Sequence, residues 1–133
     1  MPKTVYGVHP TVPLSSVVNA GDLLFVSGQL PFGEDGRLIY GGIVEQTRQA
    51  ILNIQAALQP LGAGLGDIVK TTVWLTDKND FAGFNDAYRE FFAEGPPARS
   101  TVVSALVLDV RVEIEAIAYL KLACPNEVVR FQS

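Results

Sequence analysis

Two segments with helical periodicity, on either side of a segment with strand periodicity, constrain the fold of this chain most strongly. Between positions 43 and 61, apolar residues recur every three or four positions and polar residues fill the gaps. This spacing predicts an amphipathic helix that lies on a sheet and ends near Pro60 and Gly62. Positions 67–77 then alternate between two sets of side chains, which predicts a strand. The two sets are Ile68, Lys70, Thr72 and Trp74 on one side, and Val69, Thr71, Val73 and Leu75 on the other.

A second helix is predicted over positions 79–95, because its aromatic residues repeat at the spacing of a buried stripe. Asn79 or Asp80 is suited to cap its amino end, and Gly95 is suited to end it. Asn85 lies at the border of the stripe, where we expect a solvated amide. The stripe consists of Phe81, Phe84, Tyr88, Phe91 and Phe92.

The remaining apolar segments predict further strands. Positions 22–31 read as a short buried strand, and positions 33–42 as a turn followed by a brief strand. Positions 99–106 and 110–122 predict two strands joined by a short turn around Leu108 and Asp109. The expected order is strand, strand, short strand, helix, strand, helix, strand, strand. It indicates one α+β domain over residues 1–133, with both helices on one face of the sheet.

The other face of this sheet also needs a cover, because apolar and neutral residues alternate onto it. Burial against sister subunits is the economical solution, and an apolar content of 48% in only 133 residues favours an oligomer. The residues expected on this face are Thr72, Trp74, Val103 and Tyr119.

Charge and composition exclude several classes of function. The net charge is −4 and the basic residues are scattered, which disfavours nucleic-acid binding. No apolar run reaches the ~20 residues of a transmembrane helix, and the amino terminus has no apolar signal core. With His9, expected in a surface loop, and Cys124 as the single His and Cys, we expect no disulfide, no zinc site within one subunit and a reducing cytoplasm. The glycines at 62–66 lack the spacing of a phosphate or dinucleotide loop.

Arg99 and two glutamates are the residues best suited to carry chemistry. Arg99 begins an apolar strand, where it is either a solvated strand-end charge or a guanidinium that binds an anion. Alternation places Thr101 on the same face as Arg99. In the last strand Arg111, Glu113 and Glu115 share a face, with the two carboxylates roughly 7 Å apart. These charges are either solvated or part of a covered site, and the residues alone leave both questions open.

Four strings in the same order resemble the RidA/YjgF family, the reactive-intermediate deaminases. They are "VSGQLP" at 26–31, "GDIVKTTVWLTDKNDFAGFNDAYREFF" at 66–92, "PARS" at 97–100 and "VEIEAIA" at 112–118. The resemblance implies a chorismate-mutase-like α+β fold and a homotrimer whose three sheets form an inner barrel, with ligand clefts between subunits. It also implies hydrolysis of enamines and imines, such as 2-aminoacrylate and its imine tautomer, to 2-keto acids and ammonia, without a metal or organic cofactor.

The resemblance assigns roles to particular residues. Arg99 is the arginine of "PARS", whose family role is a bidentate clamp on the substrate carboxylate. Glu113 corresponds to the glutamate that positions or activates the attacking water. Thr101 stands where the family often has a cysteine whose backbone carbonyl helps to orient water. The pocket is also lined by residues corresponding to Ser27, Gly28 and Asn85.

One departure from the family pattern bears on the substrate. The family's "GPYSQAV" corresponds to "VPLSSVV" at 12–18, so Leu14 replaces a substrate-contacting tyrosine and Ser16 replaces a glutamine. The more apolar pocket predicts a larger or more hydrophobic 2-imino acid than the one derived from alanine. Two functions stay open, a deaminase or a non-catalytic trimer that binds small carboxylates. The acidic balance and the lack of a histidine pair disfavour the ribonuclease activity attached to some relatives.

Overall fold

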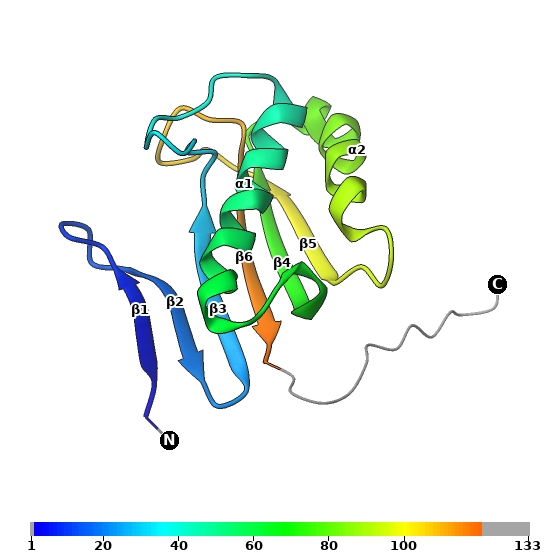
Figure 1. Cartoon of the computed structure of the whole chain (residues 1–133). Coiled ribbons are helices and arrows are strands. Elements are labelled where there is room, and N and C mark those ends of the chain that lie inside the picture. Colours follow the sequence, from blue (N-terminus) through cyan, green and yellow to red (C-terminus); the bar gives the residue numbers. More distant parts are fainter. Residues whose placement is uncertain (1, 121–133) are drawn as a thin grey trace, which may run out of the picture.

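A twisted sheet with two helices on one of its faces makes up the part of the chain that the computed structural model describes, residues 2–120 (Figure 1). Local pattern explains both kinds of element, since the central strands β4 and β6 alternate buried and more exposed side chains and each helix buries one stripe. The elements are β1 (Thr4–Val8), β2 (Ser15–Ala20), β3 (Leu23–Gln29), α1 (Ile43–Leu58), β4 (Ile68–Leu75), α2 (Phe81–Phe92), β5 (Ala98–Val103) and β6 (Val112–Tyr119).

The strand order β1-β2-β3-β6-β4-β5 brings the last strand into the middle of the sheet. All neighbouring strands are antiparallel except β4 and β5, which are parallel. A parallel pair needs a crossover, and α2 provides it between β4 and β5. The parallel pairing therefore places α2 directly over β4 and β5, next to the start of β5, where Arg99 lies.

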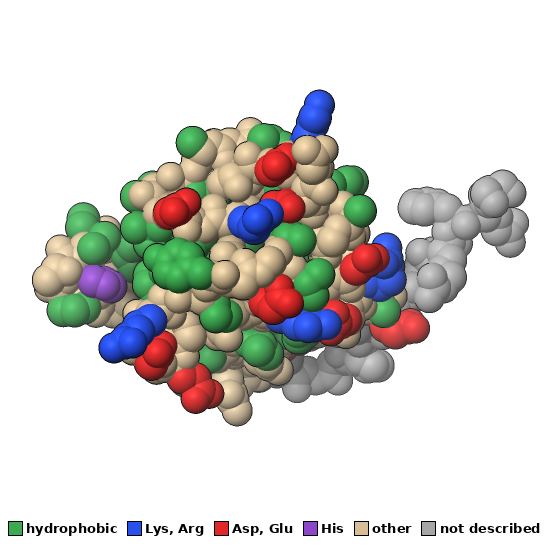
Figure 2. Space-filling model, turned by 90° about the horizontal axis from the view of Figure 1, so that it is seen from above, with side chains coloured by type: hydrophobic (Ala, Val, Ile, Leu, Met, Phe, Trp, Pro, Cys, Tyr) green, Lys and Arg blue, Asp and Glu red, His purple; other side chains and the backbone are tan. Residues whose placement is uncertain are grey.

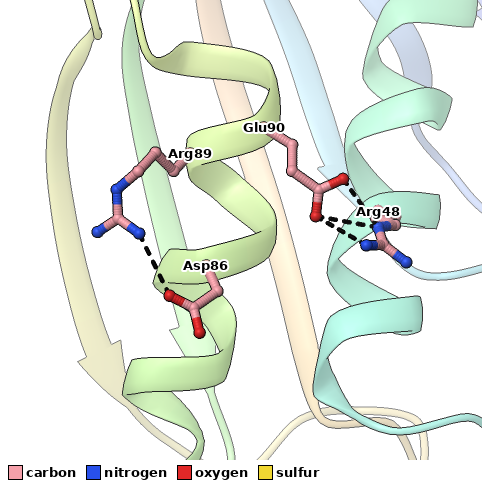
Figure 3. Close-up of polar contacts among 4 residues, drawn as sticks. All are labelled: Arg48, Asp86, Arg89 and Glu90. Atoms are coloured by element: carbon pink, nitrogen blue, oxygen red, sulfur yellow. Dashed lines mark hydrogen bonds and ion pairs between the residues drawn. The ribbon is translucent and has the colours of Figure 1, made fainter.

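The core lies between the helices and the sheet. Its strand residues come from the helix-covered face, and Leu24, Val73 and Ile114 there are completely buried. The two helices also contact each other, and at their exposed surface Arg48 of α1 forms a bidentate ion pair with Glu90 of α2, at 2.8 Å for the shortest contact (Figure 3). The predicted α+β class and the placement of both helices on one face are confirmed.

The first helix ends where the sequence predicts. The α-helical part stops at Leu58, a 3₁₀ turn at Gln59–Leu61 contains Pro60, and Gly62 closes it with a φ of +77°. The left-handed conformation at Gly62 is one that glycine adopts without strain.

The prediction of a brief strand within residues 33–42 is wrong. The predicted turn forms, with Gly36 at a φ of +79° and Gly33 donating its N–H to the carbonyl of Arg37 at 2.8 Å. Beyond it, only a single bridge pairs Phe32 with Leu38. The segment leaves the sheet at this point because β6, not this segment, pairs with β3.

Strict alternation along 67–77 fails at its first residues. The register against β6 shifts between Ile68 and Lys70, so Ile68 is buried in the core and Val69 is 47% exposed. Such an irregularity reverses the side-chain faces on one side of it. From Lys70 onward the predicted alternation holds. Val103 is also misplaced by the prediction, because it pairs with Leu75 and lies on the helix-covered face.

The predicted short turn between the last two strands is a longer connection, because β5 and β6 do not pair. It runs over residues 104–111 and crosses the end of β4, which lies between them. Arg111 precedes β6 and turns to Asp80, whose carboxylate it binds at 3.1 Å. The predicted carboxy-terminal part of the last strand, beyond Leu120, and Cys124 lie outside the described residues.

The amino end of α2 is capped differently from the prediction. Asp77, before a 3₁₀ turn at Lys78–Asp80, accepts a hydrogen bond from the N–H of Asn79 at 2.8 Å. Asp80 occupies the cap position of α2 without a side-chain cap bond, since its backbone is already helical there, and its carboxylate binds Arg111. Within residues 2–120, the two helices are too short to cross a membrane.

Candidate functional site

Arg99 lies on the helix-covered face of β5, at the wall of a groove between α2 and the chain that leads into β5. The groove has a volume of about 500 Å³. Proline at positions 96 and 97 prevents the helix from continuing, and this break opens the groove. Its lining residues are Asn85, Tyr88, Arg89, Phe92, Ala93, Pro96, Pro97 and Arg99, which include no carboxylate.

Three aromatic rings of α2 surround the Arg99 guanidinium. Its central carbon lies 5.7 Å from the centre of the Phe81 ring, 5.2 Å from that of Phe84 and 5.0 Å from that of Tyr88. All three distances are within the range of cation–π attraction. The prediction of a buried aromatic stripe holds for Phe84, Tyr88 and Phe92, but Phe81 is 45% exposed.

No carboxylate within residues 2–120 pairs with Arg99, although Arg48, Arg89 and Arg111 all have acidic partners. The guanidinium is half-buried against rings that accept none of its strong hydrogen bonds. Its N–H groups are therefore free to bind an anion that enters the groove. Of the two meanings left open for Arg99, this environment favours anion binding.

Asn85 and Thr101 lie on the same side of the sheet as Arg99. Asn85 is half-buried and lines the groove, so it lies at the border of the buried stripe, as expected. It lies one helical turn before Arg89, which lines the same groove. Thr101 follows Arg99 by two positions, and its hydroxyl oxygen is buried without a hydrogen-bond partner in the described part of the chain.

Glu113 lies on the open face of the sheet, opposite the helices. It pairs in register with Trp74 of β4, and its carboxylate lies against the backbone of Gly28. A methyl group built on Gly28 would come within 2.0 Å of the Glu113 Oε2 atom. Glycine is thus required for this approach of β3 to the side chain from β6.

The environment of Glu113 changes its acidity. Burial of the carboxyl, and secondly the negative charge of Glu115 on the same face, raise its pKa above the ordinary value of 4.5. Glu113 therefore holds its proton to higher pH than an exposed glutamate does. A raised pKa brings a carboxyl group closer to the range in which it exchanges protons at neutral pH.

Ser27 and Leu14 lie near this end of the sheet. The Ser27 hydroxyl donates a hydrogen bond to the carbonyl of Ser15 at 2.5 Å and so joins β3 to the start of β2. Leu14, the residue before Ser15, is 45% exposed. His9 of the same loop is exposed, as predicted, and its Nδ1 accepts hydrogen bonds from the backbone N–H groups of Thr11 and Val12. This ring nitrogen therefore stabilises the loop.

The predicted site residues fall into two groups on opposite faces of the sheet. Ser27, Gly28 and Glu113 belong to β3 and β6, and Glu113 points away from the helices. Arg99 and Thr101 belong to edge strand β5 and face α2, and β4 separates the two groups. A single chain does not bring Arg99 and Glu113 together, so a site that uses both requires two copies.

Sequence reasoning missed two features of these groups. The contact between Gly28 and Glu113 joins residues 85 positions apart and has no local signal. The rings around Arg99 had a signal, because Phe81, Phe84 and Tyr88 share one helix face and the next strand begins with an arginine. The groove between them depends on the parallel pairing of β4 and β5.

A second groove of about 480 Å³ lies at the opposite end of α2, between Tyr40, Asp80 and Arg111. Its charged groups are partly neutralised, since the Arg111 guanidinium binds Asp80. The backbone N–H of Arg111 donates a hydrogen bond to the amide oxygen of the buried Gln46 at 2.7 Å. In the described residues, no group of three His, Cys, Asp or Glu side chains is placed to hold a metal ion.

Comparisons with known sequences agree with the sequence motifs. The family model described as Endoribonuclease L-PSP matches residues 6–120. A RutC family protein of Pyrococcus horikoshii is 48% identical over 112 residues, which cover 83% of this chain and 89% of the relative. The 2-iminobutanoate/2-iminopropanoate deaminase of Escherichia coli is 42% identical over 110 residues, 80% of this chain and 86% of that protein. The goat protein of the same name is 43% identical over 108 residues, 80% of this chain and 79% of that protein.

Solved structures have the same fold. The YjgF gene product of Escherichia coli is 39% identical, with a TM-score of 0.78 over 87% of this chain and 94% of that one. Escherichia coli TdcF, solved with bound serine, is 39% identical, with a TM-score of 0.76 over 81% of this chain and 88% of that one.

Proposed function

Because the chain belongs to the RidA/YjgF family, we propose that it is an enamine/imine deaminase that hydrolyses reactive 2-imino acids to 2-keto acids and ammonia. Relatives named as such deaminases are 42% and 43% identical to it. The observation that carries the proposal is the environment of Arg99. This half-buried residue lies at the wall of a groove and has no acidic partner in residues 2–120. It is suited to bind the substrate carboxylate.

The second part of the proposal is a homotrimer with the site shared between neighbouring copies. Arg99 of one copy would hold the substrate, and the face of another copy that carries Gly28 and Glu113 would close over it. The opposite placement of the two groups in one chain supports this arrangement. A mass near three times 14.3 kDa in light scattering is the expected result, and a mass near 14.3 kDa would contradict the shared site.

In the proposed reaction Arg99 fixes the carboxylate, which holds the neighbouring imine carbon in place for attack. Water adds to the imine carbon and Glu113 takes a proton from this water. The imine nitrogen gains a proton in the same step. The resulting carbinolamine loses ammonia and leaves the 2-keto acid, so the sum is imine plus water to ketone plus ammonia. The raised pKa of Glu113 suits a group that accepts a proton and returns it.

The substrate is proposed to be larger or more hydrophobic than the imine of alanine. Leu14 stands where the family pattern has a tyrosine, and Phe92, Pro96 and Pro97 give the groove beside Arg99 apolar walls. Apolar walls favour substrates with an aliphatic or aromatic side chain because both surfaces are removed from water.

The test is an assay in which an amino-acid oxidase generates imino acids and semicarbazide traps them. We expect the wild type to suppress semicarbazone formation, most strongly with aliphatic or aromatic amino acids. Arg99→Gln should lose at least about 100-fold in kcat/KM, since a charge-assisted bidentate contact is removed. The exposed Arg37→Gln is the control and should leave the rate unchanged. Turnover by Arg99→Gln at the wild-type rate would refute the clamp.

A non-catalytic carboxylate-binding trimer is the second candidate. Leu14 favours it, because Leu14 removes a hydroxyl donor from the expected cleft. This candidate predicts that 2-ketobutyrate binds to the wild type but not to Arg99→Gln, while no imino acid is hydrolysed. Glu113→Gln would then bind as the wild type does.

RNA cleavage is not part of the proposal, despite the name of the matching family model. The net charge is −4, and on the face seen in Figure 2 the Lys and Arg side chains are separated from each other. The only histidine of the sequence uses one ring nitrogen within its own loop. Salt-sensitive cleavage of RNA by a pure sample would overturn this position.

A further inference from the structure

We propose that the rings of Phe81, Phe84 and Tyr88 form an aromatic cradle that fixes the orientation of the Arg99 guanidinium, and that Phe81 sets how tightly the clamp binds a carboxylate. The proposal rests on the role proposed for Arg99 above. It makes Phe81 a positioning residue, which acts on the substrate through Arg99. We refer to these three rings as the cradle.

The first evidence for the cradle is the set of contacts that Arg99 makes within residues 2–120. Its guanidinium carbon lies 5.0 to 5.7 Å from three ring centres, and no ion pair holds it there. A guanidinium held against aromatic faces keeps its N–H edge available, because cation–π attraction does not use up hydrogen bonds. The cradle can therefore orient the clamp without competing with the anion.

Two of the rings are rigid parts of the core. The Tyr88 hydroxyl is hydrogen-bonded to the Thr71 hydroxyl of β4 at 2.7 Å, and both side chains are buried. The Tyr88 ring also packs on the rings of Phe84 and Phe92, with centres 5.2 Å and 4.6 Å apart. This packing fixes the position of one side of the cradle before any ligand arrives.

Phe81 is different, because packing in the core does not account for an aromatic residue at this position. It is the first residue of α2, it is 45% exposed, and it is not part of the buried core cluster. Its ring lies over the guanidinium and reduces the access of water to it. Less water around a charge strengthens its attraction to an incoming carboxylate. A flexible arginine that is already positioned also loses less freedom when it binds.

The experiment compares Phe81→Leu and Phe81→Trp with the wild type. Leu keeps an apolar side chain but has no ring, whereas Trp gives the strongest cation–π attraction. Tyr40→Leu is the matched control, since Tyr40 is a 73% exposed aromatic residue that lines the other groove, beside Arg111. The readouts are the Kd for 2-ketobutyrate by calorimetry, and KM and kcat for imino-acid hydrolysis.

We expect Phe81→Leu to raise the Kd and the KM about two- to fivefold, with kcat unchanged, because a cation–π contact at an exposed site has about this worth. Phe81→Trp should bind at least as tightly as the wild type, and Tyr40→Leu should match the wild type. Unchanged binding by Phe81→Leu would overturn the cradle. Equal weakening by Leu and Trp would also overturn it, since shape alone would then explain the loss.

The outcome separates the cradle from the proposed function. If the wild type hydrolyses no imino acid but the Kd values follow the expected order, the deaminase is refuted and the cradle stands. If hydrolysis is normal and all Kd and KM values are equal, the cradle is refuted and the deaminase stands. The melting temperature of each variant shows that it folds.

Discussion

The two faces of the same sheet differ in what covers them and in what they carry. On the helix-covered face, side chains such as Leu24 and Ile114 have no exposed surface. On the open face, neighbours in the same strands keep part of theirs, with 36% for Leu23, 40% for Phe25 and 39% for Tyr119. Strand alternation makes both faces from one sequence, so the difference comes from the helices.

The difference shows where this protein places its titratable carboxyl. Glu113 lies on the open face beside Glu115 and Trp74, in a setting buried enough to raise its pKa. On the helix-covered face, the polar strand residues near the groove include Arg99 and Thr101 of β5 and Thr71 of β4, which is hydrogen-bonded to Tyr88. The core side thus carries Arg99 and the open side Glu113, and a reaction that needs both must join two copies.

The largest loss of stability should come from Leu24 on the helix-covered face, compared with its neighbour Leu23 on the open face. Leu24→Ala removes a completely buried side chain, so we expect a loss of about 2–5 kcal/mol in the free energy of unfolding. Leu23→Ala is its control: Leu23 is 36% exposed in the single chain, and its loss should be about 1 kcal/mol if its part of the face stays open to solvent. Urea unfolding measures both. Equal losses would mean that the open face is as well covered as the core, as a sister subunit would make it.

A methyl group on Gly28 should disturb the acid without unfolding the protein. Gly28→Ala pushes against Glu113 Oε2, the flexible end of a side chain, so the loss of stability should stay below about 1 kcal/mol. Hydrolysis should fall about tenfold, because the displaced carboxylate no longer meets the water.

Gly64→Ala is the matched control for this change. A methyl group there meets nothing within 4 Å, so activity should stay at the wild-type level. Hydrolysis by Gly28→Ala at the wild-type rate would remove the position of the Glu113 carboxylate from the mechanism.

The pH dependence of stability should report on the burial of Glu113. Its pKa is raised in the folded state, so between 4.5 and that higher value the folded state binds more protons than the unfolded state. The stability contributed by the protonated carboxyl is present below pH 4.5 and is lost as the pH rises through the folded-state pKa. Glu113→Gln should remove this decrease.

Glu115→Gln should only reduce the decrease, since the charge of Glu115 is the smaller of the two causes. Denaturation midpoints from pH 4 to 8 measure both variants. A wild-type curve parallel to that of Glu113→Gln would show that the carboxyl is not desolvated.

The smallest effect should come from the exposed pair between the helices. Arg48 and Glu90 make a bidentate contact, but both side chains are nearly half exposed (Figure 3). Solvent and salt screen such a pair, so Arg48→Met should melt like the wild type at physiological salt. A clear drop in the melting temperature of Arg48→Met would contradict this expectation. If the same substitution causes no drop in a chain that already carries Glu90→Gln, this pair stabilises the helix-covered side.

Local pattern predicted the elements well and their pairing poorly. Both helices and the strands around positions 22–31 and 67–77 follow from periodicity, because burial of one face requires it. The missing strand within 33–42 and the crossing connection over 104–111 follow from β6 pairing between β3 and β4, and nothing near those residues signals that pairing.

The sequence by itself determined the α+β class and the family, because these depend on periodicity and on short motifs, and it supplied the candidate site residues that the proposals above use. Only the tertiary structure decided that Arg99 and Glu113 point to opposite faces, and that Gly28 lies against Glu113. Alternation fixes which residues of one strand share a face. Which residues of two neighbouring strands lie on the same face of the sheet depends on strand pairing and register. Both are set by contacts between residues far apart in the chain.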